Sequence, residues 1–194
     1  MQIYLIRHGE TDWNLNDQLQ GQADTPLNDQ GRRQALETAQ KLKELNIHFD
    51  RVISSPLDRA IETAEIISQI NRENFEIDDR LMEISYGPLE GTHFEDIPKD
   101  MFAFFRDPVH VAAPAGIEAI SDVIKRQADF IEALRIEHSD DTVLISTHGI
   151  AMRGMIGYLA NLHGKDIWTF DIHNCAIYQF ELNNHHYTKP RLFL

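Results

Sequence analysis

An arginine and a histidine follow directly on an apolar segment near the N-terminus of this chain of 194 residues. Residues 2–6 read QIYLI, and Arg7 and His8 come next, with Asn14 six residues after the histidine. A neutral imidazole can attack phosphorus, and a guanidinium offers a planar fork of donors that matches phosphoryl oxygens. The pair therefore predicts chemistry on a phosphoryl group.

A second histidine occupies an equivalent position late in the chain. The apolar run TVLIS, residues 142–146, leads through Thr147 into His148 and Gly149. In open α/β sheets, ligands bind at the edge where the carboxyl ends of the strands meet. Either histidine alone is explained equally well by a structural role, but a glycine after each permits the close approach of a ligand or a second backbone segment. Together the two junctions favour a binding site.

Arg59 is a third candidate for phosphate binding. Ser55 is predicted to cap a helix whose first residue is Pro56, which places Arg59 in the first turn, where the helix dipole favours anions over cations. A phosphate bound by both the helix N-terminus and the arginine would remove this conflict. The alternative is a surface arginine paired with Glu62 on the same helix.

Alternating strands and helices are expected to position these groups. Apolar periodicity predicts strands at residues 2–6, at 52–53 and within 141–147, and helices at 28–46, from 56 onwards, from about 120 onwards and from 149 to about 162. Two C-terminal strands, 174–182 and 187–194, are predicted to be joined through Asn183 and Asn184. Connections of this length suit parallel neighbours, so the expected fold class is α/β, a three-layer αβα sandwich with a mostly parallel central sheet.

The middle of the chain lacks this regular pattern. Residues 72–116 are irregular and contain an aromatic cluster, MFAFF, at 101–105. We expect a single domain, 1–194, with a small inserted cap at roughly 84–116. The aromatic cluster either lines a pocket for an apolar leaving group or packs the cap onto its body, and packing is the commoner use of such clusters.

Composition excludes several classes of protein. The net charge is −13, and the only basic cluster is Arg32-Arg33, so no nucleic-acid partner is expected. No apolar run is long enough for a membrane span, which favours a soluble, cytoplasmic protein without a membrane partner. The single cysteine, Cys175, is expected to be buried and inert. The oligomeric state is left open, with a homodimer as one alternative.

Several short motifs occur in an order that resembles a known family. Asn14 follows RHGE, and the chain then carries Gln20-Gly21, DTPLN, SSPLDRAIETA, LMEISYGPLEG, STHGIAMR and HNCAIYQFEL, spread over nearly its whole length. In this order they are similar to the motifs of the histidine phosphatase superfamily, the phosphoglycerate mutase-like proteins. The resemblance implies a phosphoglycerate mutase-like fold and phosphoryl transfer through a histidine.

The resemblance also implies a role for each matching residue. His8 corresponds to the nucleophile that becomes a phosphohistidine, and Glu83 to the acid/base that protonates the leaving oxygen and then activates water. Arg7 and Arg59 would bind the phosphoryl oxygens and disfavour the imidazolium form of the nucleophile. The second histidine, His148, would donate a hydrogen bond to the phosphoryl group. The positions expected to border the phosphate are Asn14, Gln20, Gly21 and Gly149.

Three departures limit what the resemblance implies. Gln18 stands where many phosphatase members carry an arginine, and the segment PAGIEAISD inserts Ile117 and has Ala119 in place of a serine. True mutases also tend to carry paired arginines in the insertion, where this chain has only Arg106 and Lys99. The last difference favours hydrolysis over mutase chemistry.

The expected function is hydrolysis of small phosphate monoesters, by a phosphoric monoester hydrolase of the histidine acid type that needs no cofactor. No metal is expected, because no histidine has chelate spacing, and the adjacent His185 and His186 would point to opposite faces of a strand. A phosphoglycerate mutase and a non-catalytic protein that recognises a phosphorylated partner stay open as alternatives. The sequence does not specify the leaving group.

Overall fold

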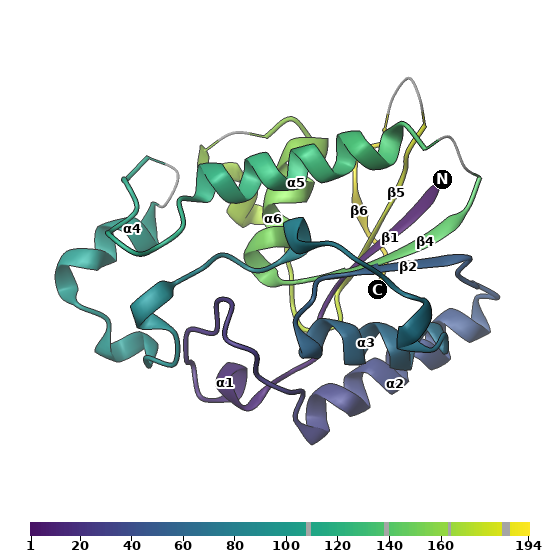
Figure 1. Ribbon diagram of the computed structural model, residues 1–194, viewed down its shortest axis with the longest axis horizontal. Coiled ribbons are helices and arrows are strands. Elements are labelled where there is room, and N and C mark those ends of the chain that lie inside the picture. The colour runs from purple at the N-terminus through teal and green to yellow at the C-terminus, as the bar shows by residue number, and fades with distance from the viewer. Residues whose placement is uncertain (108–109, 138–139, 163, 184–186) are drawn as a thin grey trace.

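A six-stranded sheet runs through the centre of the protein, whose computed structural model describes residues 1–107, 110–137, 140–162, 164–183 and 187–194 (Figure 1). The strand order is β3-β2-β4-β1-β5-β6. Four neighbouring strands are parallel, namely β3 (Glu76–Ile77), β2 (Arg51–Ser54), β4 (Thr142–Thr147) and β1 (Gln2–Arg7). The strand β5 (Ile177–Glu181) is antiparallel to β1, and β6 (Arg191–Leu192) is antiparallel to β5. The predicted mostly parallel sheet is confirmed.

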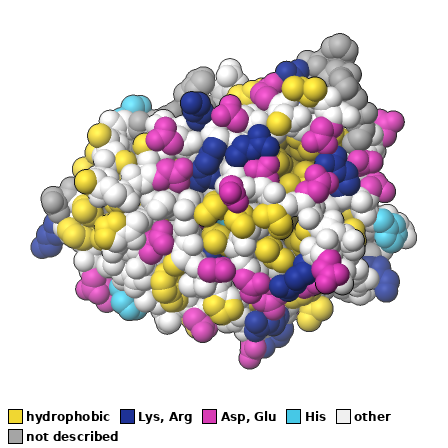
Figure 2. Space-filling view, in the orientation of Figure 1, with side chains coloured by type: hydrophobic (Ala, Val, Ile, Leu, Met, Phe, Trp, Pro, Cys, Tyr) yellow, Lys and Arg dark blue, Asp and Glu magenta, His cyan; other side chains and the backbone are white. Residues whose placement is uncertain are grey.

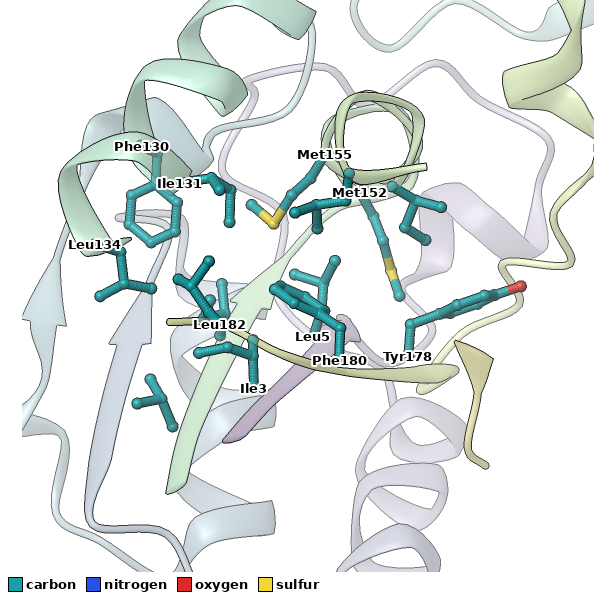
Figure 3. Packing of buried hydrophobic residues seen from close by; sticks show 14 of the residues in the cluster. Ile3, Leu5, Phe130, Ile131, Leu134, Met152, Met155, Tyr178, Phe180 and Leu182 are labelled. Carbon is teal, nitrogen blue, oxygen red and sulfur yellow. The ribbon is translucent and has the colours of Figure 1, made fainter. Parts of the chain in front are cut away.

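Helices cover both faces of the sheet. One face carries α2 (Asp29–Glu44) and α3 (Asp58–Ser68), and the other carries α5 (Ile120–Arg135) and α6 (Gly149–Leu159) (Figure 1). Because side chains alternate along a strand, Tyr4 and Ile6 of β1 pack in a cluster with residues of α2 and α3. Ile3 and Leu5 pack on the opposite side with residues of α5 and α6 (Figure 3). This arrangement confirms the three-layer αβα architecture.

Several element boundaries differ from the sequence-based expectation. The helix predicted at 28–46 has Asn28 as its N-cap, whose side chain accepts a hydrogen bond from the N–H of Gly31 at 2.8 Å. The C-terminal strands are shorter than predicted, because regular pairing covers only the ranges given above for β5 and β6. Leu182 and Tyr187 still form an antiparallel bridge across the connection, and Asn184 lies outside the described residues.

Short helical turns make up most of the irregular middle of the chain. They comprise η1 (Arg72–Asn74), η2 (Asp79–Leu81), η3 (Gly87–Leu89), η4 (Phe94–Asp96), η5 (Lys99–Met101) and α4 (Phe102–Arg106); α1 (Asp12–Leu15) and η6 (Gly164–Thr169) lie elsewhere. Segment 84–116 supplies no strand to the sheet among its described residues. Its Ile84 and Phe104 pack in one buried cluster with Ile120 and Val123 of α5. The start of α5 therefore anchors this segment.

The outer surface carries mixed charge. Figure 2 shows acidic side chains spread over one face with basic side chains among them, and hydrophobic side chains over the region of α4. Among the described residues, no helix has both the length and the apolar character needed to cross a membrane.

Cys175 is buried just before β5, as expected, and burial raises the pKa of its thiol to about 12.

Candidate active site

Strand register brings the two histidines together. Arg7, the last residue of β1, pairs with Thr147, the last residue of β4, so His8 and His148 follow at the same edge of two adjacent parallel strands. The backbone N–H of His8 donates to the carbonyl of Thr147 at 3.0 Å, and the two imidazole centroids lie 5.2 Å apart. The two similar sequence junctions therefore form one site.

Local hydrogen bonds fix the orientation of His8. Its Nδ1 lies 2.7 Å from the carbonyl of Gly9, a contact in which Nδ1 carries the hydrogen and Nε2 keeps its lone pair. Burial, followed by the charges of Arg59 and Arg7, holds the pKa of His8 well below its usual value. The amide of Asn174 donates to the carbonyl of His8 at 3.0 Å, which steadies the backbone. The side chain is thus a neutral base with one available nitrogen.

Gly9 allows the tight packing around this turn. A side chain at this position would come within 2.6 Å of the carbonyl oxygen of Gly31, so only glycine fits between the two backbone segments. The close approach expected at this glycine is confirmed, and the approaching group is the backbone of Gly31. At Gly149, in contrast, a Cβ would make ordinary contacts, at 3.6 Å from Glu83 and 3.7 Å from Arg7. Gly149 instead keeps space open between two charged groups.

Arg59 is completely buried at the start of α3. Its guanidinium donates to the carbonyls of Ala23 and Gly21, both at 2.7 Å, and its burial lowers its pKa to about 10. The alternative pairing with Glu62 is wrong, because Glu62 instead accepts from Arg32 at 2.6 Å. A buried cation held between backbone carbonyls is consistent with a group that binds an anion.

The predicted role of Ser55 as a helix cap is wrong. The helix α3 begins at Asp58 rather than Pro56, and its N-cap, Leu57, makes no side-chain capping bond. The Ser55 hydroxyl lies 2.7 Å from Nε2 of His148, and it accepts a long hydrogen bond, 3.4 Å, from the N–H of Leu57. The side chain of Ser55 therefore contacts His148, a residue 93 positions away in sequence, instead of capping the helix.

His148 is fully buried behind the cavity described below rather than in its lining. Burial, followed by the charge of Arg59, holds its pKa well below the usual value for histidine. Its Nδ1 has no hydrogen-bond partner among the described residues, although the atom is buried. Nδ1 is thus a polar atom that a ligand would stabilise.

The carboxylate of Glu83, a residue that follows η2 in the chain, lies at the N-terminus of α6. One carboxylate oxygen accepts from the N–H groups of Ile84 at 2.9 Å and of Ile150 and Ala151 at 3.1 Å each. The second oxygen also lies 3.1 Å from the N–H of Ile150 and close to Gly149. Because the dipole at a helix N-terminus favours negative charge, this position suits a carboxylate. The side chain is only 8% exposed, which leaves one side of it facing the cavity.

Sequence reasoning missed the residues that support Glu83. Arg126 of α5 donates to the carbonyl of Glu83 at 3.1 Å and to the carbonyl of Met82, and its Nε donates to the carboxylate of Glu118 at 2.9 Å. Glu118 also accepts from the N–H of Ser85 at 3.0 Å. Glu118 lies in the irregular PAGIEAISD segment, where no helical or strand spacing connects it to Arg126 or to Glu83, so the sequence offered no signal for these contacts.

These groups surround a cavity of about 360 Å³, which we call the strand-end cavity. Of the predicted site residues, all except His148 line it. The lining consists of Arg7, His8, Asn14, Gln18, Leu19, Gln20, Gly21, Arg59, Glu83, Tyr86, Gly149, Ile150, Arg153, Trp168 and Ile172. The Nε atoms of Arg7 and Arg59 are buried without a hydrogen-bond partner among the described residues. Two guanidinium groups thus present unpaired donors beside the neutral imidazole of His8.

The predicted phosphate-bordering residues are held by their own contacts. Asn14 is the third residue of α1, and its side-chain oxygen lies 3.3 Å from the amide of Asn174. Gln20 accepts from the hydroxyl of Thr25 at 2.8 Å, and Gly21 contributes the carbonyl that holds Arg59. All three predicted positions therefore lie at the cavity, with backbone or side-chain atoms already oriented.

The remaining candidate residues have structural contacts. Glu10, two residues after His8, accepts from the side-chain amide of Asn28 at 3.0 Å, which is a structural contact. Gln18, which stands in place of an arginine, donates to the carbonyl of Gly91 at 2.8 Å. It thereby links the loop after α1 to segment 84–116. The inserted Ile117 is buried in the cluster at the start of α5.

Comparison with known proteins defines the family. The sequence profile of the Histidine phosphatase superfamily (branch 1) matches residues 3–193, so the chain belongs to this superfamily. A protein of Shigella boydii serotype 4 named "Probable phosphoglycerate mutase GpmB" is 33% identical over 180 residues, which cover 91% of this chain and 83% of that protein. The family resemblance inferred from the motifs is confirmed.

Solved structures of phosphatases share the fold. The phosphoserine phosphatase of Entamoeba histolytica, determined in complex with 3-phosphoglyceric acid, is 29% identical with a TM-score of 0.81, and the match covers 100% of this chain and 95% of that one. The alpha-ribazole phosphatase of Shigella flexneri is 27% identical with a TM-score of 0.86, over 100% of this chain and 96% of that one. The chain therefore resembles phosphatases as well as relatives named as mutases.

Proposed function

We propose that this protein hydrolyses small phosphate monoesters through a phosphohistidine on His8. The observation that carries the proposal is the strand-end cavity, where His8 keeps a neutral nitrogen beside the unpaired buried Nε donors of Arg7 and Arg59. An unsatisfied buried donor costs about 1–3 kcal/mol, and the oxygens of a bound phosphoryl group would remove that cost. The buried guanidinium groups thus support binding of a dianionic ester despite the net charge of −13.

In the first step, Nε2 of His8 attacks phosphorus, and the bond between phosphorus and the ester oxygen breaks. The guanidinium groups of Arg7 and Arg59 hold the phosphoryl oxygens, and Nδ1 of His8 keeps its hydrogen on the carbonyl of Gly9. Glu83 supplies the proton that the leaving oxygen requires. The products are an alcohol and a phosphohistidine.

In the second step, water attacks the phosphohistidine while Glu83 takes up its proton, which releases inorganic phosphate and restores His8. His148 would donate from Nδ1 to the phosphoryl group. We assign Ser55 the part of a positioning residue: its oxygen accepts from the N–H of Leu57, and its hydroxyl would donate its hydrogen to Nε2 of His148. Protonation of His148 is then confined to Nδ1, the nitrogen needed as a donor.

A phosphoglycerate mutase is a second candidate, because relatives at 33% identity carry that name. In a mutase the phosphohistidine would return its phosphoryl group to the product rather than to water.

Segment 84–116 is proposed to act as a cap on the single domain, 1–194, and to select the substrate. The absence of a metal or cofactor requirement and the cytoplasmic location stay predictions.

A phosphate-release screen tests the proposed function. The wild-type protein is incubated with alkyl phosphates, phosphoglycerates, sugar phosphates and nucleotides, and the phosphoenzyme is trapped by a quench into alkaline denaturant, which preserves the acid-labile P–N bond, and detected by mass spectrometry. We expect release of phosphate and a single phosphohistidine, both lost in His8→Ala and both kept in the control His48→Ala, since His48 is exposed at a distance from the cavity. Full activity in His8→Ala would overturn the mechanism. Interconversion of the two monophosphoglycerates that depends on bisphosphoglycerate and exceeds phosphate release would instead establish the mutase.

A further inference from the structure

A second pocket adjoins the strand-end cavity and has a different lining. Its volume is about 160 Å³, and it is lined entirely by apolar and aromatic residues, namely Leu19, Ile84, Tyr86, Phe94, Phe104, Ile120, Ile150 and Trp168. Four of these residues, Leu19, Tyr86, Ile150 and Trp168, line the strand-end cavity as well. The two spaces therefore share a wall, and we call the second one the apolar pocket.

The apolar pocket adjoins residues that hydrogen-bond to Glu83. Ile84 and Ile150 donate their backbone N–H groups to the Glu83 carboxylate at 2.9 Å and 3.1 Å, and their residues also line the pocket. An ester oxygen within hydrogen-bond reach of Glu83 thus has the apolar pocket next to it. The alcohol part of the ester would extend from that oxygen past Ile150 into the pocket.

Segment 84–116 builds the outer wall of the apolar pocket. Phe104 is 2% exposed and packs against the start of α5, while Phe94 remains 48% exposed and forms part of the rim. Packing and pocket lining were alternatives for the aromatic cluster at 101–105, and Phe104 does both. A large aromatic ring at the rim suits contact with another apolar group.

The size of the pocket limits what can occupy it. An apolar protein cavity of about 150 Å³ is known to hold one benzene molecule, so a pocket of about 160 Å³ fits a single six-membered ring or a compact alkyl group of about six carbons. Without a polar group in its lining side chains other than the Tyr86 hydroxyl and the Trp168 indole, it offers little to a sugar or a nucleotide base.

We propose that the preferred substrates are phosphate monoesters whose alcohol ends in one apolar ring or an alkyl group of similar size, bound in the apolar pocket. The proposal rests on the proposed function, because it places the ester oxygen at Glu83. It assigns the specificity of the reaction to side chains of segment 84–116, α5, α6 and η6 rather than to the charged residues at the strand ends.

A substrate series with constant leaving-group chemistry tests this proposal. The wild-type protein is assayed with ethyl, butyl, hexyl and octyl phosphate, with 2-phenylethyl phosphate and with glycerol 1-phosphate. Burial of each methylene is expected to raise kcat/KM about fourfold until the pocket is full near six carbons, after which the values level off. The 2-phenylethyl ester is expected to exceed the ethyl ester by about 10- to 150-fold, and glycerol 1-phosphate to be no better than the ethyl ester.

The variant Phe94→Ala tests whether the ring of the substrate binds in the apolar pocket. Removal of this rim residue is expected to lower the ratio of kcat/KM for 2-phenylethyl over ethyl phosphate by about three- to tenfold. The matched control is Leu36→Ala, which removes an exposed apolar residue of α2 away from both cavities and should leave the ratio unchanged.

The outcomes separate this proposal from the function on which it rests. Hydrolysis of ethyl and glycerol phosphate through a phosphohistidine, without any preference for the ring or the longer chains, would overturn the apolar pocket as a leaving-group site and keep the phosphatase. Failure of every ester to give phosphate or a phosphoenzyme would overturn both. A ring preference that Phe94→Ala and Leu36→Ala reduce equally would overturn the assignment to this pocket.

Discussion

The strand-end cavity and the apolar pocket share a wall but are built in different ways. The strand-end cavity takes its groups from the ends of β1, β2 and β4 and from two helix N-termini, and its charged side chains are each held by backbone hydrogen bonds. The apolar pocket takes half of its lining residues from the irregular segment 84–116 and the rest from Leu19, α5, α6 and η6, and apolar side chains form most of this lining. Sheet register gives the first its precision, whereas packing gives the second its shape. Substitutions in the strand-end cavity should therefore slow the hydrolysis of all esters alike, and substitutions in the apolar pocket should change the order of kcat/KM among the esters.

The largest effect is expected for Glu83→Gln. Glutamine can keep an oxygen that accepts from the N–H groups of Ile84, Ile150 and Ala151, but it cannot donate or take up the catalytic proton. We expect kcat/KM to fall about 10³-fold for ethyl and 2-phenylethyl phosphate alike, within the range typical of general acid/base catalysis. Stopped-flow assays with 4-nitrophenyl phosphate provide the control, because its leaving group needs little protonation and its first step should be nearly unaffected. An equal loss for this ester would remove Glu83 from the role of general acid.

A smaller uniform effect is expected for Arg59→Lys. Lysine keeps the positive charge but lacks the planar fork that donates to the carbonyls of Gly21 and Ala23, and it lacks the buried Nε donor. Loss of an oriented donor to the reacting group should reduce kcat by about 10²-fold for every ester. Steady-state kinetics measure the effect, and thermal unfolding of the same variant shows whether the fold is retained. A change in the ratio of the two esters would contradict the division between the two cavities.

The polar side of the site could be predicted from sequence because its residues stand at strand ends and helix starts. His8 and His148 each follow an apolar run, and the parallel register that joins them follows from the α/β pattern. The bond between Ser55 and His148 could not be predicted. Ser55 follows β2 and His148 follows β4, so their contact depends on the register between these two strands and on where α3 begins. Local capping propensity suggested a different partner for this serine, and tertiary contact prevailed.

The apolar pocket was beyond sequence reasoning for a related reason. Its lining comes from five separate parts of the chain, among them Leu19, Phe104, Ile150 and Trp168, and none of these residues has a spacing that connects it to the others. An aromatic cluster such as MFAFF predicts burial but not which side of a side chain faces a cavity. Likewise, the support of Glu83 by Arg126 and Glu118 involves polar contacts across an irregular loop. Such contacts are set by packing and not by periodicity.

A third prediction concerns the buried titratable groups, which lie at the strand-end cavity. Burial and Arg59 lower the pKa of His8 and His148 in the folded protein, whereas in the unfolded chain both take up protons near pH 6.5. The unfolded state thus binds more protons below this pH, and the free energy of unfolding should fall by about 1.4 kcal/mol per pH unit for each histidine. Urea denaturation between pH 7 and pH 5 measures the slope.

The slope should be smaller by about 1.4 kcal/mol per pH unit in His8→Asn, which removes one of the two buried bases. Phe94→Ala serves as the control from the apolar pocket, and its slope should match that of the wild-type protein. Carboxylates contribute equally to all three proteins, so the difference between slopes isolates the histidine. An unchanged slope in His8→Asn would mean that His8 gains its proton in the folded state as readily as in the unfolded chain.

The smallest effect is expected for Ser55→Ala, which leaves every charged group of the strand-end cavity in place. Loss of the hydroxyl contact with Nε2 of His148 removes one neutral hydrogen bond, worth about 1 kcal/mol, so kcat should fall about fivefold for all esters with little change in KM. The matched control is Ser54→Ala, because Ser54 is equally buried at the end of β2 but donates to the carbonyl of Ser55. Nitrogen NMR shifts of His148 should report a mixture of tautomers in Ser55→Ala and a single tautomer in Ser54→Ala. If both variants lose the same activity and keep one tautomer, Ser55 supports only the packing of the strand end, and the hydrogen on Nδ1 of His148 must be held there by the bound phosphoryl group itself.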